Sequence, residues 1–132
     1  MRRAPPRLVA VVTLEDVRQV ALSLPGVYER VVGDRFKFKV GVVVFATVSP
    51  DETAMGFGFP KYERAGLIAS EPAKFFMPRP SDQRYNWIRV WMASIDQQEM
   101  RELVTDAWRM CVSKKVRAAF DAAERGTDGR SG

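Results

Sequence analysis

The sequence predicts an α+β domain of two layers, in which helices cover one face of a mostly antiparallel sheet. A length of 132 residues suits one domain. The middle of the chain alternates polar and apolar residues, which is typical of half-exposed strands, and both outer parts repeat apolar residues at helical spacing. Short turns between the strands indicate antiparallel pairing, so we expect the second sheet face to be partly open.

The N-terminal part predicts an arm followed by a helix. Residues 1–12 are expected to form a flexible arm, and a single domain is expected over 13–125. Thr13 is a suitable N-cap, with acids in the first turn, where the helix dipole favours them. Apolar residues then recur at helical spacing as far as Leu24, and Pro25-Gly26 ends the helix.

Three strands are expected next. Residues 35–40 alternate bases with apolar side chains, and 42–48 form the continuous apolar run of a central strand. Residues 53–59 alternate large apolar side chains with small ones. Gly56 and Gly58 within this strand predict a bulge or a close approach to the backbone.

The C-terminal half predicts a helix, one or two strands and a last helix. A short helix is expected over 62–70, an edge strand near 75–77 and a longer strand over 85–93. The last helix begins with Asp96 as N-cap and Glu99 completing a capping box. Val112-Ser113 is a candidate interruption, and the tail 126–132 is expected to be disordered.

The composition excludes several classes of catalytic and metal site. Histidine is absent, which removes Ser-His-Asp and Cys-His nucleophiles and the HExxH zinc site. Cys111 stands alone, so no intrachain disulfide and no cysteine zinc site are expected. No apolar run approaches the ~20 residues of a membrane span. We therefore expect a cytoplasmic protein that is not an enzyme and needs no metal or cofactor.

The predicted strand over 85–93 has two different faces. One is aliphatic, with Ile88, Val90 and Met92. The other carries aromatic rings around a guanidinium: Tyr85, Trp87, Arg89 and Trp91. Such rings suit stacking on bases if this face is open. They equally suit packing beneath a helix or against a dimer partner, because exposed tryptophans are rare.

Basic residues gather in two other segments. Arg35, Lys37 and Lys39 share one strand face about 7 Å apart, which suits phosphate contact as well as an ordinary solvated strand. Lys114 and Lys115 lie toward the basic end of the last helix, where the helix dipole alone explains such charges. The net charge of +5 favours anionic partners only mildly.

Five segments in succession resemble the MmcQ/YjbR family of small bacterial proteins: LEDVRQVALSLPGVYE (14–29), FKVGVVVFATVSPDE (38–52), ERAGLIASEPAKF (63–75), WIRVWMASID (87–96) and ELVTDAWRMCVSKKV (102–116). The resemblance implies a CyaY-like two-layer fold and DNA binding through a double-wing surface, with no catalytic residue to transfer. Lys114 and Lys115 match the family's basic pair. The chain departs from the family at Val112-Ser113, where Ala-Pro is frequent, and at the bulky Trp87 and Trp91.

These observations lead to one functional hypothesis and two alternatives. The leading hypothesis is a non-enzymatic protein that binds DNA or another nucleic acid. Arg35, Lys37, Lys39 and Arg89 would contact phosphates, while Trp87, Trp91 or Tyr85 would stack on bases. The alternatives use the same aromatic face for protein interaction or homodimerisation, or for a small aromatic ligand. The choice between these functions depends on whether Trp87 and Trp91 share an open sheet face with the basic residues Arg35, Lys37 and Lys39.

Overall fold

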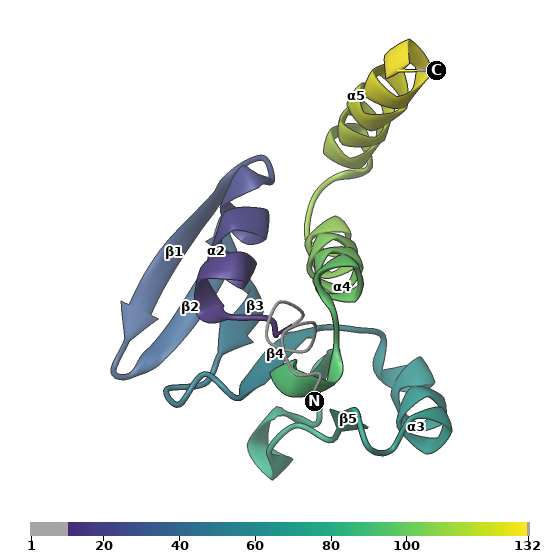
Figure 1. The fold of residues 1–132 in the computed structure, drawn as a ribbon. Coiled ribbons are helices and arrows are strands. Elements are labelled where there is room, and N and C mark those ends of the chain that lie inside the picture. Colours follow the sequence, from purple (N-terminus) through teal and green to yellow (C-terminus); the bar gives the residue numbers. More distant parts are fainter. Residues whose placement is uncertain (1–10, 132) are drawn as a thin grey trace, which may run out of the picture.

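A computed structural model describes residues 11–131, with side chains over 11–126, and the α+β class is confirmed (Figure 1). The helices are α2 (Leu14–Ser23), α3 (Lys61–Ser70), α4 (Gln97–Arg109) and α5 (Lys114–Ser131). The strands are β1 (Val27–Val32), β2 (Arg35–Val40), β3 (Val43–Val48), β4 (Ala54–Gly58), β5 (Phe75–Phe76) and β6 (Trp87–Trp91). Short 3-10 turns cover Pro80–Asp82 and Met92–Ser94.

The strands form one six-stranded sheet in the order β1-β2-β3-β4-β6-β5, and every neighbouring pair is antiparallel. Helix α2 packs on β1 and β2, and α4 packs on β3 and β4, so both helices cover the same face of the sheet. Helix α3 lies beside β5 at one end, and α5 extends past α4 (Figure 1). The expected two-layer arrangement is therefore present.

Strand β1 is the element that the sequence pattern does not reveal. The pattern places three strands between the first two helices, whereas the structure has four. Glu29 of β1 lies opposite the buried Phe38 and therefore faces the helices, where an apolar residue would be expected. Its carboxylate accepts two hydrogen bonds from Arg18 of α2, at 2.8 and 2.9 Å. This pairing breaks the alternation on which strand prediction depends.

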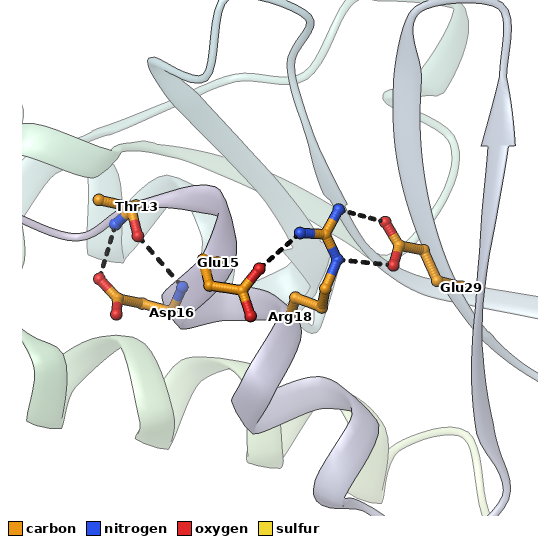
Figure 2. Close-up of polar contacts among 5 residues, drawn as sticks. All are labelled: Thr13, Glu15, Asp16, Arg18 and Glu29. Carbon is orange, nitrogen blue, oxygen red and sulfur yellow. Dashed lines mark hydrogen bonds and ion pairs between the residues drawn. The ribbon is translucent and has the colours of Figure 1, made fainter.

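Helix α2 is held in place by polar contacts at its start and on its exposed flank (Figure 2). Thr13 and Asp16 form the reciprocal bonds of a capping box. Arg18 lies between Glu29 and Glu15, and its contact with Glu15 is 2.7 Å long. Hydrogen bonds to Glu29 and then Glu15 raise the pKa of Arg18. The bidentate pair fixes the direction of α2 across β1.

The core lies between the sheet and α2 with α4. The β2–β3 register shifts after the Phe38–Ala46 pair, so Phe45 is an extra residue on β3. Both Phe45 and Ala46 are fully buried, as expected where a bulge turns two successive side chains toward one face. Trp108 of α4 is also fully buried, and its indole Nε1 donates to the carbonyl of Pro25 at 3.1 Å.

The chain ends differ in detail from the expected boundaries. Residues 1–10 of the predicted arm lie outside the described residues, and Val12 is already buried at 2% exposure. The chain leaves the helix after Arg109 and re-enters it at Lys114, so Val112-Ser113 does mark an interruption. Helix α5 continues to Ser131, beyond the residue at which the predicted domain ends. Within residues 11–131, no helix is long and apolar enough to cross a membrane.

Asp96 is the N-cap of α4, as expected, because its carboxylate accepts from the amide of Glu99 at 2.8 Å. The predicted capping box is only half present. The Glu99 carboxylate instead pairs with Lys74, which precedes β5, at 2.8 Å. This ion pair connects the start of α4 to the far edge of the sheet.

Arg64 of α3 is a buried cation that organises the chain before β6. Its guanidinium donates to the carbonyls of Gln83, Tyr85 and Trp87, at 2.9, 3.2 and 2.8 Å. The side chain is 8% exposed and has no carboxylate partner within the described residues. Carbonyl dipoles therefore supply the compensation that a buried charge requires.

Gly56 of β4 is required by a close approach on the uncovered face. A Cβ placed there would lie 2.8 Å from Trp87 Nε1 and 2.9 Å from Thr47 Oγ1, closer than real Cβ contacts. Gly58, at the end of the same strand, differs, because its Cβ would lie at an ordinary 3.6 Å from the Cβ of Ala107. The expected close approach is thus present at Gly56.

We expect Arg64→Ala to lower the free energy of unfolding by about 2–3 kcal/mol, because three buried carbonyls lose their donor. Urea denaturation measures the change. The control, Arg101→Ala, removes an exposed arginine from α4 and should change stability by less than about 0.5 kcal/mol. Equal denaturation midpoints for Arg64→Ala and the unmodified protein would contradict this role.

We expect Gly56→Ala to lower the free energy of unfolding by about 1–3 kcal/mol, because the new methyl group must displace Trp87 or Thr47. Gly58→Ala is the matched control and should stay within about 0.5 kcal/mol of the unmodified protein. Thermal unfolding followed by tryptophan fluorescence measures both effects. A Gly56→Ala protein with unchanged stability and unchanged emission would show that the contact is not tight.

Candidate functional site

The aromatic-basic face of β6 and the basic face of β2 are the same face of the sheet. Register partners run across four strands in one row: Lys37, Thr47, Gly56 and Arg89. The neighbours of these residues along each strand, such as Phe38 and Ile88, are fully buried beneath the helices. The row therefore lies on the side that α2 and α4 leave uncovered, and it joins the two basic segments.

A trough of about 640 Å³ lies on this uncovered face. The two central strands and the turn between them contribute the small side chains Thr47, Ser49, Ala54 and Gly56, and β3 adds Val43 and Val44. Large side chains from the flanking strands and the loop before β6 border it: Arg35, Lys37, Tyr85, Trp87 and Arg89. The hollow thus follows from the sequence, because small residues on β3 and β4 stand between large ones on β2 and β6.

The trough is strongly cationic. Four bases line it, namely Arg35, Lys37, Arg79 and Arg89, against the single acid Asp82. Asp82 is already paired with Arg79 at 3.3 Å, whereas the other three bases have no ion-pair partner among the described residues. Burial lowers the pKa of Arg89, and repulsion from Arg35 and Arg79 lowers it further. Arginine stays charged at neutral pH despite such shifts, so the site attracts anions.

An aromatic stack flanks the trough on the β5–β6 side. The Arg89 guanidinium carbon lies 4.7 Å from the ring centroid of Phe76, and Phe76 stacks on Trp91 with centroids 4.3 Å apart and an interplanar angle of 23°. Trp91 remains 43% exposed. This stack holds the Arg89 head in one place at the border of the trough.

The other predicted site residues are placed less centrally. Lys39 shares the face but lies outside the trough, with its ammonium 6.0 Å from the Tyr28 ring centroid. Trp91 also shares the face without lining the trough. Lys114 and Lys115 are exposed at the start of α5 and do not line it.

Two residues in or beside the trough, Arg79 and Phe76, are not predicted as site residues from the sequence. Arg79 lies in the irregular segment before β6, where no periodicity indicates a direction. Phe76 belongs to a two-residue strand, and only its pairing with Arg89 brings it into the stack. Cys111 also lines the trough, and burial raises the pKa of its thiol. Within the described residues, no cluster of three acidic, cysteine or histidine side chains could hold a metal ion.

Comparisons with known proteins agree with this architecture. The YjbR family model matches residues 22–110, which span β1 to the end of α4. The crystal structure of Deinococcus radiodurans protein DR2400, described by the family-model domain DUF419, superposes with a TM-score of 0.66 at 17% identity, covering 81% of this chain and 86% of that one. No curated protein gives a significant match. The chain belongs to the YjbR family.

Proposed function

We propose that the protein is a non-enzymatic nucleic-acid-binding protein that uses the uncovered sheet face. The observation that carries the proposal is a group of basic side chains without ion-pair partners among the described residues. Arg35 and Lys37 on β2 and Arg89 on β6 lie on one face around one trough. Lys39 extends the same face. Contacts of this kind neutralise phosphates irrespective of base sequence.

The aromatic side chains supply the second part of the proposal. Trp87 and Tyr85 border the trough, and Trp91 is exposed beside it. Flat rings next to cations suit a ligand that carries both bases and phosphates, because base–aromatic stacking adds to charge neutralisation. Lys114 and Lys115 would add contacts only if the ligand extended past the trough toward α5.

Homodimerisation through this face is the alternative that the charges disfavour. A twofold interface places the same patch of each copy in contact, so the basic patch of Arg35, Lys37 and Arg89 in one copy would face the basic patch of the other. Like charges without intervening acids repel at close range. A small aromatic ligand fits the trough better, although Trp87 is the only one of the three tryptophans that lines it.

We expect the protein to be monomeric at micromolar concentration in sedimentation equilibrium, because self-association through the cationic face would bring like charges together. Because salt screens this repulsion, any residual self-association should strengthen as the salt concentration rises. A stable dimer in which Trp91 fluorescence becomes shielded from a soluble quencher would instead favour the interaction-module alternative.

We expect the protein to bind labelled DNA with an affinity that falls steeply between about 50 mM and about 200 mM salt. The variant Arg35→Gln/Lys37→Gln should bind more weakly, and its slope of log affinity against log salt should be shallower by about two contacts. Fluorescence anisotropy measures both quantities.

The matched control for these charge changes is Arg101→Gln/Arg125→Gln, which removes two exposed positive charges from helices α4 and α5. Its affinity and salt slope should stay close to those of the unmodified protein. Absent binding at micromolar protein, or binding insensitive to salt, would refute the proposal. An equal loss in the Arg101→Gln/Arg125→Gln protein would mean that only net charge matters.

A further inference from the structure

We infer that the trough binds one unpaired nucleotide of a single-stranded nucleic acid, with the base against Trp87 and the flanking phosphates on Arg35, Lys37 and Arg89. This inference rests on the proposed function and adds the strandedness of the ligand and the place of a base. It follows from the shape of the trough, the free polar groups within it and the position of its charges.

The shape of the face selects against a duplex. Protein elements that read double-stranded DNA project into a groove, since a helix or a two-stranded ribbon fits a major groove about 12 Å wide. The uncovered face is hollow where such an element would protrude, because Thr47 of β3 and Ala54 and Gly56 of β4 have small side chains there. A hollow accepts a group that projects from the ligand. Paired bases are stacked inside a duplex, whereas those of a single strand are free to project.

The size of the trough fits one nucleotide. Its volume of about 640 Å³ falls within the range of about 300–1,000 Å³ typical of pockets for single small molecules. Stacking platforms for longer strands are open along the strand direction, and the exposed Trp91 and Tyr85 beside the trough offer such surfaces to neighbouring bases.

Two polar groups converge on an empty position above Gly56. The indole Nε1 of Trp87 and the hydroxyl of Thr47 lie 2.8 and 2.9 Å from the point where a Cβ would stand. Neither atom has a hydrogen-bond partner within the described residues, whereas the buried Trp108 Nε1 donates to a carbonyl. Among the described residues, Arg109 Nε is the only buried side-chain nitrogen or oxygen without a partner, so these two groups are accessible from the trough. The pair is therefore suited to the polar edge of a base or to a phosphate oxygen.

The charges stand on both sides of this position. Lys37 and Arg89 are the outer members of the row that contains Thr47 and Gly56. Arg35 lies two residues before Lys37 on the same strand face and is close enough to Arg89 to lower its pKa, after the larger effect of burial. An anion between β2 and β6 would relieve that repulsion. A phosphate on each side of a bound base satisfies this arrangement.

The test compares three ligands for the full-length protein at low salt. A labelled oligothymidylate of about 12 nucleotides should bind at least about tenfold more tightly than a duplex of equal length. Thymidine monophosphate, competing with the oligonucleotide, should bind more weakly than the strand because it offers one phosphate rather than a series. Anisotropy and competition give the three affinities.

Substitutions locate the base. Trp87→Ala should weaken oligothymidylate binding by about tenfold, the effect of losing one stacked base, and change duplex binding by less than about twofold. Tyr62→Ala, which removes an exposed ring from α3 outside the trough, is the control and should change both affinities by less than about twofold. If Trp87→Ala fails to fold by circular dichroism, Thr47→Val replaces it, because it removes the free hydroxyl and should weaken the strand selectively.

The outcomes separate this inference from the proposed function. Equal affinity for strand and duplex, or strand binding that Trp87→Ala and Thr47→Val leave unchanged, would overturn the single-strand inference while nucleic-acid binding stands. Thymidine monophosphate binding as tightly as the strand would show that a free nucleotide is the occupant and would also overturn it. No binding to strand or duplex would overturn both proposals.

Discussion

The alternation of side-chain size along β4 is the constraint on which both faces of the sheet depend. Met55 and Phe57 point into the core, where they pack with residues of α2 and α4. Ala54 and Gly56 point to the other face and leave space above the centre of the sheet. A strand shows its faces with a period of two, so one short sequence specifies a filled layer and a hollow at the same time. Shifting the register by one residue would bury the hollow and expose the core.

The hydrogen bonds of Arg64 are a second interaction on which the trough depends. Arg64 binds the carbonyls of Gln83, Tyr85 and Trp87, and therefore sets the path of the chain as it enters β6. The same segment positions the Trp87 side chain over Gly56. Backbone carbonyls compensate the guanidinium without a carboxylate, which keeps a negative charge away from the cationic face. Helix α3 is thus a structural support for a surface that it does not itself form.

Sequence patterns predict most of this fold but only the ingredients of the site. Helices α2 and α4 and strands β2, β4 and β6 follow from periodicity, since each buries one regular face, and β3 follows from its continuous apolar run. Strand β1 does not, because Glu29 occupies an inward position and is compensated by Arg18, a partner that local pattern cannot identify. In the site, Lys37 and Arg89 are recognisable individually, but only the register across β3 and β4 shows that they share a row. Arg79 and Phe76 come from segments without a period and depend entirely on tertiary pairing.

Repulsion among the basic residues around the trough lowers the stability of the folded protein, and a bound anion would remove that repulsion. Burial lowers the pKa of Arg89 most, and the charges of Arg35 and Arg79 lower it further, which means that the charged state of this group is disfavoured in the folded protein. Arginine does not lose its proton at neutral pH, so the repulsion remains as a loss of stability. Asp82 pairs with Arg79, and its charge together with that of Asp51 only partly offsets the repulsion at Arg89. The Phe76–Trp91 stack restrains Arg89 without neutralising it. A bound anion adds negative charge where Asp82 is the only acid among the described residues that lines the trough, and it stabilises the fold through its own binding energy. The repulsion in the free protein and the affinity for anions therefore have the same origin.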